Sequence, residues 1–308
     1  MIELSRHNGN LNQAYGGDTL NTAVYLARQL QKSHGTVRFV TGLGRDPFST
    51  SMIQSWAEEG IKTDLIVRSE SLLPGLYFIE TTPEGERSFY YWRGESAARV
   101  WINGSQGDEV CGLLMDMDVL YASGISLAIL NEQAREKLFS LFRVFRSRGG
   151  RVIFDNNFRP RLWASQEEAR RAYEQMLSCT DVAFLTLDDE DALWGGTADM
   201  ESLRMRCTVA GISEVIIKRG AAACIVIHEG QEFNIDAIPV PEDRVVDTTA
   251  AGDSFSAGYL ACRLQGGDVC ESARQGHILA SRVIQHPGAI IPKAAMPVSE
   301  IIQQEKDK

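Results

Sequence analysis

The sequence predicts an α/β protein: a doubly wound, mostly parallel sheet with a small β-hairpin lid. From residue 119 to residue 285, strand-like apolar runs alternate with amphipathic stretches of helical period. The runs are apolar on both faces, which is typical of parallel strands that helices cover on either side. An aromatic segment between residues 72 and 93 interrupts this alternation and predicts the hairpin.

The elements follow in order along the chain. The first expected strand, Val119–Ser123, precedes a helix over residues 133–148 that ends at a Gly-Gly pair. Ligands of such sheets bind at the carboxyl ends of the strands, and polar clusters follow Phe154, Leu185 and Ile217. Further strands are expected at Arg151–Asp155, Val182–Thr186, Glu214–Lys218 and Cys224–His228, with helices over Gln166–Leu177, 202–210, 253–264 and 268–285.

The hairpin is expected from Leu76–Thr81, a turn at residues 83–86 and a second strand at residues 88–92. Its strands are rich in aromatic and β-branched residues. A two-stranded ribbon of this size is only marginally stable alone. We therefore expect it to lie over the mouth of the sheet as a lid, or to pair with another subunit in a homodimer or higher homo-oligomer.

Composition limits the class of protein. The 308 residues can bury a large core, as one α/β domain or one domain with an appendage. A net charge of −10 without a Lys/Arg-rich run argues against nucleic acid or an anionic membrane as partner. No apolar run approaches the roughly 20 residues that span a bilayer, and the first residues form no signal-peptide pattern. Six scattered cysteines without a C-x-x-C pair favour a cytoplasmic protein.

The segment Asp247-Thr-Thr-Ala-Ala-Gly-Asp253 carries the strongest chemical signal. Ala250, Ala251 and Gly252 are small, so an anion can approach their backbone N–H groups at the start of a helix. Asp253 would repel that anion unless it acts as a base, taking a proton from a hydroxyl that attacks a phosphate. The alternative is an acidic N-cap on an ordinary helix.

Three blocks together resemble the ribokinase-like (PfkB) family of sugar kinases. They are Tyr15-Gly-Gly-Asp-Thr-Leu-Asn-Thr-Ala23, Thr41-Gly-Leu-Gly-Arg-Asp-Pro-Phe48 and Asp247-Thr-Thr-Ala-Ala-Gly-Asp253. Within that family, residues 73–77, 89–93, 155–163 and 288–292 resemble the bacterial kinases of 2-keto-3-deoxygluconate. The resemblance implies one kinase domain over residues 1–297, with lid segments at about 1–15 and 62–95 inserted. Residues 298–308 are expected to be a frayed tail.

The resemblance implies an ATP- and Mg²⁺-dependent carbohydrate kinase of sugar-acid catabolism. It would phosphorylate the 6-hydroxyl of 2-keto-3-deoxygluconate to give 2-keto-3-deoxy-6-phosphogluconate. Asp253 matches the catalytic base, and Ala250, Ala251 and Gly252 match the anion hole. Ala250 stands where the family usually has a glycine, and we assume that its φ is negative.

Other functions stay open. A kinase of another sugar, of the fructose or ribose type, would share the fold, as would a non-catalytic sugar- or nucleotide-binding protein. A Rossmann dehydrogenase is disfavoured, because no G-x-G-x-x-G follows a first strand.

Candidate substrate-binding residues follow from the substrate's carboxylate and from the resemblance. Arg159 lies just past a strand end and Arg93 ends a hairpin strand, and arginine holds a carboxylate with two hydrogen bonds. Tyr77 and Tyr91 are expected to lie against the sugar chain, or else to pack in the core or a dimer contact. The full expected set is Gly16, Gly17, Asp18, Asn21, Tyr77, Tyr91, Arg93, Arg159 and Asp253.

The nucleotide and metal assignments rest on the resemblance. Residues 218–220 match the turn along the nucleotide phosphates, with a solvated basic turn as the alternative. Residues 185–191 are a degenerate form of the family's magnesium-associated block. Asp188 and Glu190 are candidates for metal contact through water, or are simply acids in the first turn of a helix. The expected nucleotide-binding residues are Asn157, Lys218, Arg219, Gly220, Ala250, Ala251 and Gly252.

One departure from the family concerns the first residues. The family normally has a buried strand before the residues that match Met1-Ile-Glu-Leu-Ser5, and this strand is absent here. Loss of a central strand leaves two neighbouring strands with unpaired backbone groups and exposed apolar faces. We therefore expect either a start further upstream or a compromised kinase.

Overall fold

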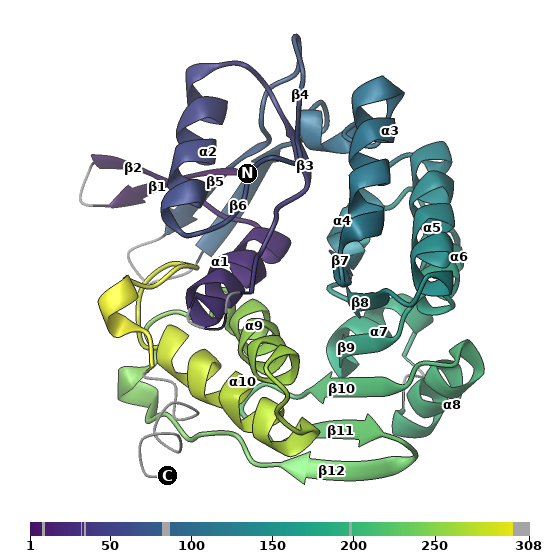
Figure 1. Ribbon diagram of the computed structural model, residues 1–308. Coiled ribbons are helices and arrows are strands. Elements are labelled where there is room, and N and C mark those ends of the chain that lie inside the picture. Colours follow the sequence, from purple (N-terminus) through teal and green to yellow (C-terminus); the bar gives the residue numbers. More distant parts are fainter. Residues whose placement is uncertain (8–9, 32, 34, 82–86, 197–198, 298–308) are drawn as a thin grey trace.

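A mostly parallel six-stranded sheet forms the centre of the molecule (Figure 1). The computed structural model describes residues 1–297 except 8–9, 32, 34, 82–86 and 197–198, so the expected hairpin turn and the tail lie outside the described residues. The strand order is β12-β11-β10-β9-β8-β7, with β7 to β10 parallel and the last two strands antiparallel. These strands are β7 (Val119–Ser123), β8 (Arg151–Asp155), β9 (Val182–Thr186), β10 (Glu214–Lys218), β11 (Cys224–His228) and β12 (Gln231–Ile235). The predicted fold class is confirmed.

Helices cover both faces of this sheet because its strands are apolar on both sides. Along β8, Phe154 packs toward α5 and α6, whereas its neighbour Ile153 packs toward α9 and α10. α1 lies beside α9 on that second face (Figure 1). The covering helices are α1 (Asp18–Leu30), α9 (Ala251–Leu264) and α10 (Val269–Val283) on one face, and α3 (Gly104–Leu113), α5 (Glu132–Ser147), α6 (Gln166–Leu177) and α8 (Met200–Ala210) on the other.

A second sheet of four strands, in the order β2-β1-β5-β6, projects from the N-terminal half. It consists of β1 (Ile2–His7), β2 (Asn10–Tyr15), β5 (Leu76–Thr81) and β6 (Arg87–Trp92). β5 and β6 form the expected hairpin, but β1 pairs in parallel with β5. The hairpin is therefore not an isolated ribbon: one of its edges is already covered by β1, where Ile2 pairs with Leu76.

β3 (Thr41–Leu43) and β4 (Ile66–Arg68) pair in parallel as a separate two-stranded sheet, and three further helices complete the set of strands and α-helices that the structure describes. These helices are α2 (Pro47–Glu58), α4 (Gly124–Ala128) and α7 (Leu187–Trp194). Several helices begin a few residues from their expected starts because side-chain caps set the first turn. Asn131, Asp199 and Asp268 each accept a hydrogen bond from a backbone N–H three residues on, at the starts of α5, α8 and α10.

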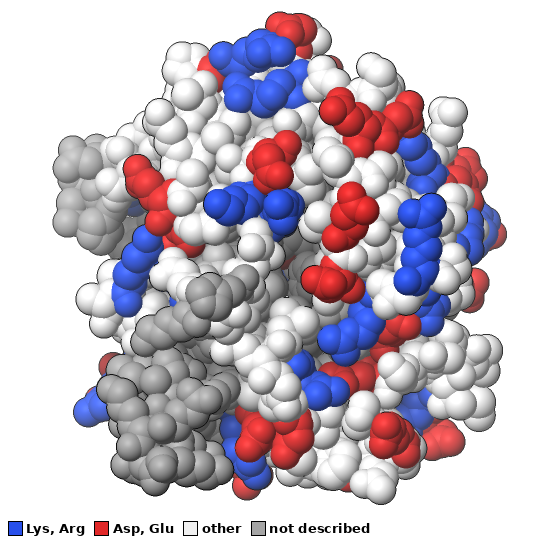
Figure 2. Space-filling view, viewed as in Figure 1, with Lys and Arg blue, Asp and Glu red and all other residues white. Residues whose placement is uncertain are grey.

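The large sheet ends at β7. A cavity of about 1720 Å³ separates this strand from residues 36–40, which lead into β3. On the face seen in Figure 2, acidic and basic side chains are interspersed, without a broad area of one sign. Within the described residues, no helix combines the length and the apolar character that crossing a membrane requires.

Candidate active site

The carboxyl ends of β7, β8 and β10 meet the N-termini of α1 and α9. At these strand ends lie Ser123, Asp155 and Lys218. Ser123 donates a hydrogen bond to Asp18 in the first turn of α1, and Lys218 forms an ion pair with Asp155. The polar residues that follow the predicted strands are thus brought together with two of the three blocks singled out in the sequence.

The loop before α9 has a conformation that the sequence did not predict. Ala250 is the N-cap residue, and its φ of 60° and ψ of 16° place it in the left-handed region. The assumption of a negative φ at Ala250 is therefore wrong. An alanine in this region costs roughly 1–2 kcal/mol that a glycine would not. Asp247 anchors the loop by accepting hydrogen bonds from the backbone N–H groups of Thr249 and Gly288, at 3.0 and 2.8 Å.

This loop brings the small residues Ala250, Ala251 and Gly252 to the start of α9, as expected. The first amides of a helix have no intrahelical acceptor, and the helix dipole adds partial positive charge. The arrangement is suited to an anion.

Asp253 follows directly in the first turn of α9 and is half-buried. The side-chain amide of Asn21 on α1 donates to its carboxylate at 2.8 Å, and the Thr22 hydroxyl donates to its backbone carbonyl at 3.3 Å. Burial, followed by the nearby Asp18 carboxylate, raises the pKa of Asp253 to about 7. A carboxylate with such a pKa can accept a proton near neutral pH and is more basic than an ordinary aspartate.

Lys218 lies beneath the start of α9 rather than in a solvated turn. Its Nζ atom is 2.6 Å from Oδ2 of Asp155, which also accepts from the hydroxyls of Ser256 and Tyr121 at 3.1 and 3.3 Å. The same Nζ lies 3.5 Å from the position that a Cβ atom on Gly252 would occupy. The lysine thus holds positive charge next to the expected anion site while it neutralises Asp155.

The rest of the expected nucleotide turn continues from the end of β10. Arg219 donates to the carbonyl of Ala223 at 2.6 Å, which closes the turn through Gly220. The predicted contact of this turn with nucleotide phosphates stays a prediction.

The sugar-side block of Gly16, Gly17 and Asp18 lies at the N-terminus of α1. A Cβ atom on Gly16 would lie 2.6 Å from the hydroxyl of Tyr77, so only glycine allows this tyrosine to approach. Asp18 accepts from the side-chain amide of Asn157 at 3.0 Å, in addition to Ser123, and burial raises its pKa. Asn157, expected on the nucleotide side, therefore contacts the sugar-side block.

The hairpin brings Tyr77, Tyr91 and Arg93 to the same side of the molecule. The rings of the two tyrosines are 5.9 Å apart, and the Arg93 guanidinium lies 4.4 Å from the Tyr91 ring centre. Arg93 lines a small cavity of about 110 Å³ together with Gly16, Gly17 and Asp18. Tyr77 itself is buried and donates to Glu3.

Arg159 lies beyond the end of β8. It is half exposed, donates to the carbonyl of Phe158 at 2.7 Å and approaches Asp189 at 3.4 Å. Within the part of the chain that the structure describes, these contacts leave donors of its guanidinium free for a ligand.

The two metal candidates differ in their surroundings. Glu190 is buried and forms an ion pair with Arg206 at 2.7 Å, while Asn156 donates to its other oxygen at 3.3 Å. Asp188 is exposed on the first turn of α7. Within the described ranges, no three His, Cys, Asp or Glu side chains are grouped as a protein-built metal site. Glu190 is thus already paired with Arg206, and of the two candidates Asp188 is the one that fits contact with a metal ion through water.

Sequence reasoning missed the roles of Ser123, Asp155 and Asn156. Each lies at or next to the carboxyl end of a buried strand, and each contacts a residue of the predicted site. Their position in the sequence could have identified them, because polar residues directly after parallel strands gather at one edge of a sheet.

Comparisons with known proteins by family model, sequence and structure all identify carbohydrate kinases. A family model described as pfkB family carbohydrate kinase matches residues 2–296. A 2-dehydro-3-deoxygluconokinase of Dickeya dadantii (strain 3937) is 56% identical over 298 residues, and one of Escherichia coli (strain K12) is 55% identical, each match covering 96% of both chains. The crystal structure of a fructokinase with bound ATP from Xylella fastidiosa superposes with a TM-score of 0.82 at 26% identity, covering 100% of this chain and 97% of that one.

The raised pKa of Asp253 predicts a pH-dependent effect of Asp253→Asn on stability. Since the folded-state pKa of about 7 lies above the ordinary value of 3.8, the contribution of this group is fully present below about pH 4 and is lost as the pH rises through 7. One pKa unit corresponds to about 1.4 kcal/mol. Because Asp253 is only half-buried, we expect Asp253→Asn to gain on the order of 1 kcal/mol relative to wild type between pH 5 and pH 8.

Urea unfolding at both pH values measures this change in free energy. The exposed Asp243→Asn serves as the matched control and should shift stability equally at the two pH values. A difference between Asp253→Asn and wild type that does not vary with pH would contradict the assignment.

Proposed function

The chain belongs to the pfkB family of carbohydrate kinases, and from this premise we propose that it transfers the γ-phosphoryl group of ATP to 2-keto-3-deoxygluconate, also called 2-dehydro-3-deoxygluconate. The acceptor is the 6-hydroxyl, and the product is 2-keto-3-deoxy-6-phosphogluconate. Two relatives that are 55–56% identical to this chain over 96% of its length are named 2-dehydro-3-deoxygluconokinase.

The observation that best supports this phosphoryl transfer is the position of Asp253. Its carboxylate follows directly after the small residues at the start of α9 and is held by Asn21 at 2.8 Å. A hydroxyl bound beside Asp253 would lose its proton to this carboxylate as it attacks the phosphoryl group. The amides at Ala250, Ala251 and Gly252 would hold the charge on the transferring oxygens.

The nucleotide would lie along α9 and the turn at residues 218–220. The Nζ atom of Lys218 lies 2.6 Å from the Asp155 carboxylate and neutralises its charge. This limits the electrostatic repulsion between Asp155 and the triphosphate. Bound Mg²⁺ would supply positive charge that stabilises the phosphates, and such ions keep much of their water. Asp188 is the residue that fits contact with it through water, because Glu190 is paired with Arg206.

The sugar acid would lie between α1 and the hairpin. Asp18 and Asn21 can bind sugar hydroxyls, and Arg159 and Arg93 are the cations available for the carboxylate. We propose that the four-stranded sheet closes over the substrate as a lid and excludes water. ATP as substrate and six free cysteines are consistent with a cytoplasmic enzyme.

The lid is also the proposed dimer contact. Phe89, Tyr90, Tyr91 and Trp92 are 41–62% exposed and adjacent on β6, which is an edge strand. A two-fold contact would cover both the open edge and the aromatic rings.

An ATP-consumption assay with 2-keto-3-deoxygluconate, fructose and ribose tests the function, and we expect the sugar acid to be preferred. Asp253→Asn keeps the shape of the side chain but cannot accept the proton. We expect kcat to fall at least about 10²-fold with the sugar acid still bound. Calorimetric titration of the variant with the sugar acid separates lost chemistry from lost folding. Activity of the variant within threefold of wild type would rule out Asp253 as the base.

Arg159→Ala tests recognition of the carboxylate. A hydrogen bond to a charged group contributes roughly 1.5–3 kcal/mol, so we expect KM for the sugar acid to rise about 10- to 100-fold. A neutral analogue should be barely affected. Arg161→Ala, two positions along and exposed, is the matched control. Equal losses for the acid and the neutral analogue would mean that Arg159 has a structural role.

Light scattering tests the dimer. We expect wild type at micromolar concentration to have twice the monomer mass, and Trp92→Asp to be monomeric because a charge would be buried in the contact. Val209→Asp changes an apolar residue on α8 that is more exposed than Trp92, and it should leave the mass unchanged. A fully active monomeric wild type would overturn this proposal.

A further inference from the structure

Glu190 is a buried carboxylate that the proposed phosphoryl transfer does not use. It is 3% exposed, and the guanidinium of Arg206 on α8 pairs with its Oε2 atom at 2.7 Å. The same guanidinium lies 4.6 Å from the centre of the Trp194 ring, and this contact fixes the direction from which Arg206 approaches. The Glu190 carboxylate in this ion pair can only accept hydrogen bonds. Its second oxygen is therefore an acceptor that a neighbouring group must match.

That neighbouring group is the side-chain amide of Asn156, the residue directly after β8. Asn156 is 1% exposed, and its Nδ2 atom donates to Oε1 of Glu190 and to the carbonyl of Thr186, both at 3.3 Å. Its Oδ1 atom accepts from the backbone N–H of Asn157 at 2.8 Å. The two ends of an amide have nearly the same shape, so packing alone does not distinguish this orientation from the flipped one. The two acceptors select it, because a flipped amide would place its oxygen against theirs.

The orientation of the Asn156 amide determines how Asn157 is held. The φ of Asn157 is 28°, in the left-handed region that residues other than glycine adopt where surrounding contacts hold them there. The bond from its backbone N–H to Asn156 is such a contact. The side-chain amide of Asn157 then donates to Oδ2 of Asp18 at 3.0 Å, and Ser123 donates to the same oxygen. These two bonds fix the plane of the Asp18 carboxylate and thus the direction of its Oδ1 atom.

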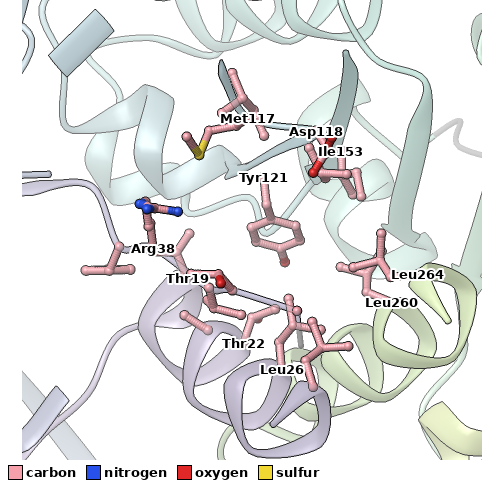
Figure 3. Close-up of a pocket in the computed structure, with 18 of the residues that line it drawn as sticks. Thr19, Thr22, Leu26, Arg38, Met117, Asp118, Tyr121, Ile153, Leu260 and Leu264 are labelled. Carbon is pink, nitrogen blue, oxygen red and sulfur yellow. The ribbon is translucent and has the colours of Figure 1, made fainter. Parts of the chain in front are cut away.

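The backbone that leads into this turn is held independently of Glu190. Asp155 accepts hydrogen bonds from Lys218 at 2.6 Å and from Tyr121 at 3.3 Å, and Figure 3 shows Tyr121 projecting from β7 toward α1. The backbone N–H of Asn156 donates to the carbonyl of Phe184 on β9 at 2.9 Å. The chain therefore leaves β8 at a fixed position. What Glu190 decides is the orientation of the Asn156 side chain and the turn that follows it.

We propose that Glu190 and Arg206 are positioning residues of the kinase. They select the orientation of the Asn156 amide, and through Asn157 they set the Asp18 carboxylate that would bind a hydroxyl of the sugar acid. The kinetic part of this inference rests on the proposed function, because that function assigns Asp18 to the acceptor substrate. A buried ion pair often adds no more stability than apolar side chains of the same volume, whereas it can select one arrangement of polar groups.

Glu190→Gln tests the selection by enzyme kinetics. Glutamine keeps the size of the side chain but offers a donor as well as an acceptor, so it no longer selects one orientation of Asn156. We expect KM for 2-keto-3-deoxygluconate to rise about 10-fold and kcat to fall by less than KM rises. KM for ATP and the Mg²⁺ concentration for half-maximal rate should stay within about twofold of wild type. A raised Mg²⁺ requirement with an unchanged KM for the sugar acid would overturn the proposal.

Hydrogen exchange of backbone N–H groups, followed by NMR, tests the same step without catalysis. In Glu190→Gln the N–H of Asn157 loses its constant acceptor, so its exchange should become at least about 10-fold faster. The N–H of Asn156, which is bonded to Phe184, should exchange as in wild type. This measurement does not depend on which sugar is the substrate, so it distinguishes a failure of the inference from a failure of the proposed function. Unchanged exchange at Asn157 would overturn the inference.

A double variant separates positioning from stability. Arg206→Met leaves the Glu190 carboxylate buried without its partner, so Tm should fall. Combining Arg206→Met with Glu190→Gln removes the lone charge and should recover most of the lost Tm, yet KM for the sugar acid should stay raised. Recovery of both Tm and KM would show a purely structural pair and would overturn the proposal. Arg204→Met is the matched control: it breaks an ion pair of the same helix with Glu232 and should leave KM unchanged.

Discussion

The buried ion pair of Asp155 and Lys218 joins the elements on which the site depends. The two side chains are 4% and 11% exposed, and one carboxylate oxygen receives Lys218 of β10, Ser256 of α9 and Tyr121 of β7. A single carboxylate oxygen of Asp155 thus links three strands and the helix that carries Asp253. Removing one partner of such a pair typically costs about 3–5 kcal/mol, because the other charge is left buried and alone.

Around this pair, the site also holds the carboxylates of Asp18 and Asp253. Burial raises the pKa of Asp253, and the nearby carboxylates of Asp18 and Asp155 raise it further. The same crowding makes Asp253 a better base and makes an anionic nucleotide harder to bind. Helix amides, Lys218 and an ion that arrives with the nucleotide are the charges available to resolve this conflict.

α1 links the catalytic base to the open edge of the sheet. One side of this helix holds Asp253 through Asn21 and Thr22, and another side, with Ala23 and Leu26, lines the cavity beside β7. The packing of α1 against β7 is therefore incomplete where the base needs a fixed support.

The sequence by itself determined the sheet class, the order of strands and helices in the second half, and the small-residue loop before Asp253, because periodicity and turn residues are local signals. Tertiary structure alone decided the positive φ of Ala250, the contact of Asn157 with Asp18, the pairing of Glu190 with Arg206 and the addition of β1 to the hairpin. Each of these depends on residues distant in sequence: Asn157 and Asp18 are 139 positions apart. Local patterns specify which face of an element is apolar, but the partner of a buried polar group is set only when separate elements meet.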